Sequence, residues 1–235
     1  VVNTLINGGW LIRVDDVIKM HPVINEVART IFDKGNYECI MPLLSNSCVC
    51  ADNSPTAERQ SLTELLVGIS NNIIGLELKS EDIMDFLIGA AYICLPFSHV
   101  NHSLRVAQYV LSFQDKLFSV NSFCFMLSHL VLADAYHKLG ELEKSQVHSQ
   151  TIINNWDDSF NQSDLWILSQ AYNLLGWIYL VQWNDVEAET ALLKSIDVLQ
   201  ASTDSDLVFD RYVGLALLYE IRGDAERAEE YRIKA

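Results

Sequence analysis

The sequence predicts a mainly α-helical protein built from stacked helical hairpins, and two observations carry this prediction. First, a tyrosine closes a similar apolar stretch four times, at intervals of 40 to 44 residues. Self-similarity with a period of about 20 to 50 residues is typical of arrays in which each unit packs on its neighbours. Second, apolar residues recur at helical spacing after residue 20, where no strand-like alternation occurs. The four tyrosines are Tyr92, Tyr136, Tyr179 and Tyr219.

Residues 1–35 differ from this pattern and predict a partial winged-helix module. The Gly8-Gly9 pair suits the end of a helix, and alternating apolar residues on either side of Asp15-Asp16 predict a β-hairpin. Pro22 suits the first position of a following helix, because a missing N–H costs nothing there. Residues 36–54 have no helical or strand-like periodicity and are predicted to be a connector.

Residues 55–235 predict the helical array. Ser54 suits the cap of the first helix, with Pro55 at the first helical position and Glu58 in the opening turn. Pro96 is expected to break a later helix, and short turns are expected between the others. The predicted helices run over about 55–76, 81–95, 101–113, 120–139, 141–154, 164–182, 185–199, 206–222 and 224–234.

Small residues are expected to hold the two helices of each hairpin close together. One lies three positions before each tyrosine, and an alanine follows two of the tyrosines by nine positions. A glycine four positions after Tyr136 and Tyr219 allows the left-handed conformation that ends a helix. These residues are Gly89, Ala133, Gly176 and Ala216, then Ala188 and Ala228, and finally Gly140 and Gly223.

This pattern resembles the tetratricopeptide repeat (TPR). Residues 172–196 match its order of aromatic residue, Leu-Gly, Tyr, turn and Ala, and residues 212–231 match again with a fuller turn, Gly223-Asp224. Residues 132–145 match more weakly because Ser145 replaces the alanine. The resemblance covers about residues 81–235, with a period longer than the 34 residues of that repeat. It implies an α-α superhelix of helical hairpins that binds protein or peptide.

A second resemblance lies in residues 19–29, which are similar to the end of the winged-helix module of NB-ARC/STAND signalling ATPases. Met20-His21 match the Met-His-Asp element of that family, and Pro22 departs from its Asp. The resemblance implies that His21 contacts the nucleotide β-phosphate in the full-length protein. The chain has no G-x-x-x-x-G-K-[ST] loop, so we expect no bound nucleotide or other cofactor in this fragment.

Composition excludes several classes of partner. The net charge of −15 argues against a nucleic-acid surface, which needs concentrated Lys and Arg, and against binding to an anionic membrane. The five cysteines have no metal-type spacing, which suits a reducing, cytoplasmic location. The start of the chain lacks both Met and the basic residues of a signal peptide, so we expect a fragment of a longer protein.

The predicted binding surface is the face of the first helices that the Leu/Gly/Tyr packing set leaves free. Trp177 is the best anchor for a peptide, because a large ring with one donor suits that role. The alternative is that Trp177 is buried between repeats. A carboxylate clamp of Lys and Asn is absent, so a basic or amphipathic peptide, or another domain of the same protein, is the expected partner. The predicted partner-binding residues are Asp134, His137, Lys138, Asn173, Trp177 and Glu220.

No set of residues predicts catalysis or metal binding. His99 and His102 lack further donors, and His129 and His137 are expected to share a helix face as polar residues. The leading hypothesis is the sensor or protein-binding array of a bacterial STAND-type signal-transduction or transcriptional regulator. The alternatives are a freestanding TPR peptide-binding regulator and an enzyme, for which no residue set suggests a substrate.

Overall fold

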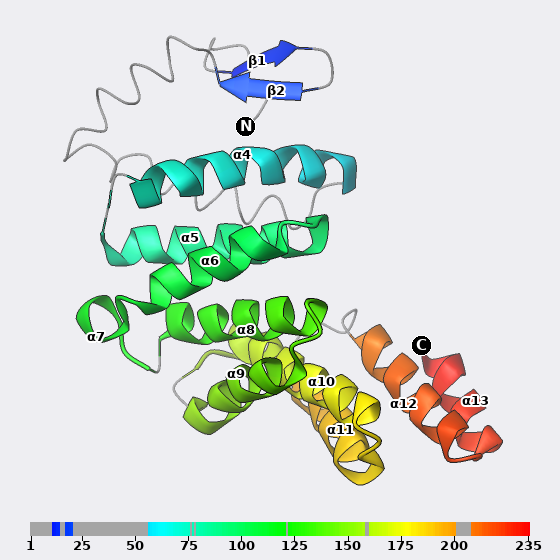
Figure 1. The fold of residues 1–235 in the computed structure, drawn as a ribbon. Helices are drawn as coiled ribbons and strands as arrows, with labels where there is room; N and C mark the ends of the chain where they lie inside the picture. Colours follow the sequence, from blue (N-terminus) through cyan, green and yellow to red (C-terminus); the bar gives the residue numbers. More distant parts are fainter. Residues whose placement is uncertain are drawn as a thin grey trace. The chain divides into compact units, whose positions relative to one another are not determined.

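In the residues that the computed structural model describes, the chain forms a series of helices and, near its start, one short pair of strands (Figure 1). The structure describes residues 11–14, 17–20, 56–75, 77, 79–120, 122–157, 160–200 and 208–235. The chain divides into two compact units, Val1–Val106 and Ala107–Ala235, and each is described by itself.

In the first unit, β1 (Leu11–Val14) pairs antiparallel with β2 (Val17–Met20), in the range for which the sequence predicts a hairpin. Leu11 lies opposite Met20, and Val14 lies opposite Val17. His21, the rest of the predicted winged-helix module and the connector 36–54 lie outside the described residues. The winged-helix assignment and the boundaries at residues 35 and 54 therefore stay predictions.

Among its described residues, the first unit has the helices α4 (Thr56–Gly75), α5 (Glu81–Cys94), the 3-10 turn η2 (Leu95–Phe97) and most of α6 (Val100–Leu111). The Ser80 side chain caps α5 by accepting a hydrogen bond of 3.3 Å from the Ile83 backbone N–H. Pro96 ends this helix, as predicted. α5 is buried over most of its surface and packs on α4, where the Cys94 thiol donates to the Thr63 carbonyl at 3.7 Å.

The second unit contains three helical hairpins in sequence: α8 with α9, α10 with α11, and α12 with α13 (Figure 1). Helix α10 also packs on α8 and α9, and α12 packs on α10 and α11, so each hairpin contacts the one before it. This is the stacking of repeats that the tyrosine spacing predicts. The elements are α7 (Gln114–Leu117), α8 (Phe123–Lys138), α9 (Leu142–Asn155), η3 (Gln162–Asp164), α10 (Leu165–Val181), α11 (Asp185–Gln200), α12 (Phe209–Ile221) and α13 (Ala225–Lys234).

A left-handed residue ends the first helix of each hairpin. Gly140 and Gly223, with φ of 77° and 76°, lie four positions after their tyrosines, as predicted. Trp183 takes the same position after Tyr179 with φ of 57°. This backbone conformation turns the chain sharply and lets the second helix fold back.

A left-handed residue also follows the first helix of the hairpin in the first unit, but it lies two residues later than the spacing from Tyr92 predicts. This residue is Ser98, with φ of 69°, four positions after Cys94. The Ser103 hydroxyl donates to the Ala91 carbonyl at 2.7 Å, just as Ser145 donates to the Ala133 carbonyl at 2.7 Å with the same separation along the chain. Cys94 therefore occupies the place that tyrosine holds in the other hairpins.

The prediction that Gly89 allows close helix packing in this hairpin is consequently wrong. A Cβ added to Gly89 would meet nothing within 4 Å. The physical reason for the error is that α5 is apolar on almost every side, so its hydrophobic pattern does not fix which face meets α6. At Gly176 the prediction is confirmed, because a Cβ there would lie 2.6 Å from the Leu192 side chain.

Candidate functional site

The residues predicted on α8 lie together near its C-terminal end. Asp134 and Lys138 form an ion pair of 3.4 Å, one helical turn apart. His137 is half-buried beside them, and burial lowers its pKa, helped by Lys138 and opposed by Asp134. Three polar groups of mixed charge are thus available on this helix, but the Asp134–Lys138 pair partly neutralises itself.

The two residues predicted on α10 are less accessible. Asn173 is only 5% exposed and donates through Nδ2 to Gln170 Oε1 at 3.3 Å. Trp177 is half-buried against the core cluster that includes Leu192 and Leu215, and its ring reaches the Cβ position of Gly214 on α12 at 3.6 Å. The geometry therefore favours the interpretation of Trp177 as a packing residue between hairpins, with one part of its ring at the surface.

Exposed apolar side chains extend this surface in a way the sequence prediction only partly covered. Val181 on α10 and Leu217 and Ile221 on α12 are all exposed, whereas side chains of this type are usually buried. Glu220 lies among them and pairs with Arg232 of α13 at 2.9 Å. The position two residues after each repeat tyrosine could have revealed Val181 and Ile221. We call the following set the first-helix surface: Asp134, His137, Lys138, Trp177, Val181, Leu217, Glu220 and Ile221.

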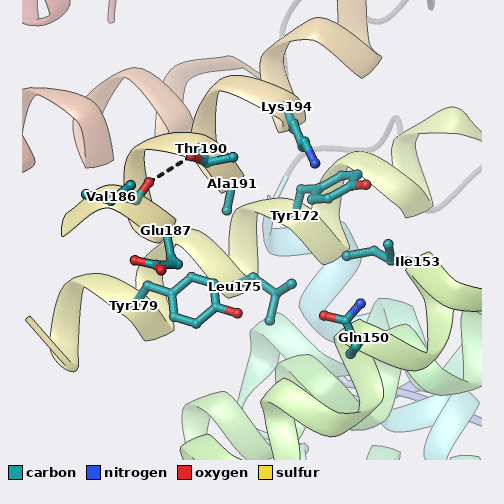
Figure 2. Close-up of a pocket in the computed structure, with 10 residues that line it drawn as sticks. All are labelled: Gln150, Ile153, Tyr172, Leu175, Tyr179, Val186, Glu187, Thr190, Ala191 and Lys194. Carbon is teal, nitrogen blue, oxygen red and sulfur yellow. Dashed lines mark hydrogen bonds between the residues drawn. The ribbon is translucent and has the colours of Figure 1, made fainter. Parts of the chain in front are cut away.

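A groove of 310 Å³ lies elsewhere in this unit, between α9 and α11 with α10 as its floor (Figure 2). Its volume falls within the range of small-ligand pockets, about 300 to 1,000 Å³. Residue spacing within one helix does not reveal this groove, because its lining comes from three helices at once. The lining residues are Gln150, Ile153, Tyr172, Leu175, Tyr179, Val186, Glu187, Thr190, Ala191 and Lys194.

The groove carries one charge of each sign. Figure 2 shows Lys194 with Tyr172 at one end and Glu187 with Tyr179 at the other. The Lys194 ammonium lies 5.6 Å from the centre of the Tyr172 ring, a cation–π distance. In the part of the chain that the structure describes, neither Lys194 nor Glu187 forms an ion pair with another side chain.

Two exposed apolar residues lie close in sequence here, Trp183 in the turn between α10 and α11 and Val186, which lines the groove, in the first turn of α11. Trp183 is 75% exposed and Val186 is 69% exposed. The left-handed conformation of Trp183 costs about 1 to 2 kcal/mol relative to glycine, which the α8–α9 and α12–α13 turns have at this position. A large exposed ring kept in a strained turn indicates a role at the surface.

The histidines of α8 and α9 form a pair that the sequence did not predict. His129 Nδ1 lies 2.9 Å from His148 Nδ1, so His129 pairs across the hairpin and not with His137. Burial, with the neighbouring His148, lowers the pKa of His129 to about 4. Among the described residues, no group of three or more His, Cys, Asp or Glu side chains gathers as a metal site would require.

The comparisons with known proteins agree with the repeat architecture. No protein-family model and no curated protein matches the sequence. Among solved structures, a protein of Podosopora anserina described as a putative kinesin light chain with nearly identical TPR-like repeats is 16% identical, with a TM-score of 0.56 over 83% of this chain and 90% of that one. A substituted form of the same protein is 15% identical, with a TM-score of 0.61 over 85% of this chain and 94% of that one.

BtubC (BKLC) from P. vanneervenii is also similar, with 13% identity and a TM-score of 0.56 over 84% of this chain and 89% of that chain. Identities this low concern the fold alone. Separately, no helix in the described ranges combines the length and apolar character needed to cross a membrane. The chain is a mainly helical protein with a TPR-like repeat fold.

Proposed function

We propose that this chain is a protein- or peptide-binding repeat domain and that the first-helix surface is its binding face. The observation that carries the proposal is the exposure of Val181, Leu217 and Ile221 on the first helices of two adjoining hairpins. Exposed apolar side chains on neighbouring helices are a common feature of interaction sites. The half-buried ring of Trp177, which packs between the same two helices, adds a rigid anchor.

The chemistry of the surface favours an amphipathic partner with basic side chains. Its apolar residues suit leucine-like side chains, and Asp134 and Glu220 are its acidic residues. The net charge of −15 attracts a basic partner over distance and speeds encounter at low salt. The proposal contains no catalytic step, and a domain of this kind acts through binding alone.

The likeness of residues 19–29 to STAND-type ATPases suggests the setting. We propose that the array is the sensor of a bacterial signal-transduction or transcriptional regulator, which binds a partner or covers the ATPase in its resting state. His21 would then contact the nucleotide in the full-length protein. A P-loop encoded upstream of Val1 would support this setting, and calorimetry should show that the 235-residue chain alone does not bind ATP.

The binding face is tested by selecting peptides on the immobilised chain and measuring their affinity for variants. Leu217→Asp should weaken the selected peptides at least tenfold, because a buried carboxylate would then face apolar side chains. Ile233→Asp is the matched control, since Ile233 is also exposed to solvent but lies on α13 outside the first-helix surface. Equal affinity of both variants and the parent chain would refute this face.

A further inference from the structure

Two hairpins of the second unit, α8–α9 and α12–α13, cover their repeat tyrosines in the same way. In α8–α9, the His148 ring stacks on Tyr136 at 5.6 Å and 7°, and the Lys144 ammonium lies 5.1 Å from the same ring. In α12–α13, Tyr231 stacks on Tyr219 at 5.6 Å and 2°. The Arg227 guanidinium lies 5.3 Å from that Tyr219 ring. Each tyrosine is thus covered by one flat ring and at least one cation.

The covering groups come from equivalent positions of the second helix. The stacking ring follows its tyrosine by the same number of residues in both hairpins, and so does the cation, Lys144 or Arg227. In α10–α11 these two positions are occupied by Ala191 and Glu187. Alanine has no ring to stack, and glutamate has the opposite charge.

Tyr179 is therefore the repeat tyrosine whose cover is missing. No ring or cation of the described residues lies over it at the distances found for Tyr136 and Tyr219. Its packing on the core cluster fixes the ring in place. Tyr179, Glu187 and Ala191 all line the 310 Å³ groove, so the groove opens at the place that side chains fill in the neighbouring hairpins (Figure 2).

We propose that this groove binds an arginine side chain presented by a protein partner. The proposal rests on the proposed function of the chain as a protein-binding domain, and it adds a second contact outside the first-helix surface. A guanidinium is flat, so it can stack on Tyr179 as the His148 and Tyr231 rings stack on their tyrosines. It also carries the positive charge that Lys144 and Arg227 supply, and Glu187 can accept its N–H groups.

The other groove residues set the orientation and the neighbours of this arginine. Lys194 already covers Tyr172 at the opposite end, and its charge opposes a second cation there. Val186 and Leu175, which also line the groove, offer apolar contact to the residues that flank the arginine. An arginine flanked by apolar residues therefore fits the groove better than a run of basic residues.

The test measures binding of the blocked tripeptide Leu-Arg-Leu to the 235-residue chain by NMR. The arginine side-chain protons should shift upfield, because they would lie over the face of an aromatic ring. The matched probe Leu-citrulline-Leu has the same shape without the charge and should bind at least about tenfold more weakly. Equal affinity for the two probes, or no upfield shift, would overturn the proposal.

Two variants locate the site. Glu187→Gln removes the carboxylate charge and should weaken the arginine probe about tenfold. Ala191→Tyr places a ring where Tyr231 lies in the next hairpin, so it should fill the groove and abolish binding while the melting temperature stays within a few degrees. Glu229→Gln, on the exposed face of α13, is the control and should bind as the parent chain does. Unchanged binding by Ala191→Tyr would refute the groove as the site.

Leu217→Asp separates this proposal from the proposed function. It should leave the tripeptide affinity unchanged, because Leu217 lies outside the groove lining. Loss of tripeptide binding in Leu217→Asp but not in Ala191→Tyr would refute the arginine site and leave the first-helix surface standing. The reverse pattern supports the arginine site even if the first-helix surface binds nothing.

Discussion

The hairpins α8–α9 and α10–α11 have the same helix–turn–helix arrangement, but different kinds of side chain fill the space between their helices. In α10–α11 the close approach is made by Gly176, and the space is occupied by the buried side chain of Leu192. At the equivalent positions α8–α9 has Ala133 and the small buried residue Ser149. A large side chain is paired with glycine in one hairpin, whereas two small side chains occupy these positions in the other, so the same fold tolerates different core residues here.

The same two hairpins also differ in polarity. The α8–α9 hairpin places His129, His148 and Ser149 between its helices, whereas α10–α11 has Tyr172, Ala191 and Leu192 at the matching positions. The apolar hairpin is the one with the groove and the exposed Trp183. A repeat array can therefore vary the side chains of one hairpin without altering how the hairpins stack.

Removing the large side chain of the apolar hairpin should have the largest effect. Leu192→Ala leaves a cavity between α10 and α12, because Leu192 is fully buried and lies against both Gly176 and Gly214. We expect a loss of about 2 to 5 kcal/mol in the free energy of unfolding, measured by denaturant titration. Leu193→Ala, at the exposed neighbouring position, should cost much less. Equal losses would mean that Leu192 does not fill this space.

Adding a methyl group to Gly176 tests the same contact between α10 and Leu192 by overfilling it. Gly176→Ala brings a Cβ to 2.6 and 2.7 Å from two Leu192 atoms, so the side chain must shift. We expect a loss of about 1 to 3 kcal/mol in unfolding free energy. Gly89→Ala is the matched control in a helix where the new Cβ meets nothing within 4 Å.

Gly89→Ala should raise the free energy of unfolding by up to about 1 kcal/mol, because alanine is the better helix former. A loss of stability in Gly89→Ala would indicate that Gly89, and not Ala91, lies at the close approach of the first hairpin. The register deduced from Ser98 and Ser103 would then be wrong.

The polar hairpin should make stability depend on pH. The pKa of His129 is about 4 in the folded chain and about 6.5 when unfolded, so the unfolded state binds more protons between these values. Stability should therefore fall as pH decreases from 7 toward 4, by about 1 kcal/mol between pH 7 and pH 5.5 from this group. Thermal melts of His129→Gln should show a weaker dependence on pH than the parent chain.

Part of the dependence should remain in that variant. Burial, with Arg105 and His99 nearby, also lowers the pKa of His102 to about 4 in the first unit. His102→Gln should remove the part of the pH dependence that comes from His102. The α10–α11 hairpin contains no histidine and should add nothing to this dependence. Identical pH profiles of His129→Gln and the parent chain would contradict the burial of a neutral imidazole pair in α8–α9.

The repeat architecture could be predicted from sequence because it rests on local rules. The tyrosine spacing, Gly140 and Gly223 located the hairpin turns, and Pro96 located a helix end. The position of the first hairpin could not be predicted to the residue, because α5 is apolar on nearly all sides and Tyr92 is a chance match. A turn formed by Ser98 or Trp183 instead of glycine gave no recognisable pattern.

The candidate site was harder to predict than the fold. Free-face positions on single helices, such as His137 and Glu220, follow from spacing within one helix. The groove depends on what three helices leave unfilled, and the small residue Ala191 carries no chemical hint by itself. The groove becomes evident when the hairpins are aligned, because Ala191 occupies the position that His148 and Tyr231 occupy in the other two hairpins. Residue types that differ at equivalent positions are thus a better guide to this site than any motif.

The smallest predicted effect concerns a buried hydroxyl of the polar hairpin that has no hydrogen-bond partner among the described residues. Ser149 Oγ is buried and has no hydrogen-bond partner, whereas Ser195 in α11 donates to the Ser169 carbonyl at 2.7 Å and accepts from Arg211 Nε at 3.0 Å. Because an unpaired buried hydroxyl is destabilising, Ser149→Ala should raise the unfolding free energy by about 0.5 to 1 kcal/mol, measured by denaturant titration. Ser195→Ala should lower it, since Arg211 would lose an acceptor. If both serines prove stabilising, the polar hairpin must satisfy its hydroxyl through a water molecule between α8 and α9, and its contrast with α10–α11 would be one of hydration and not of unmet hydrogen bonds.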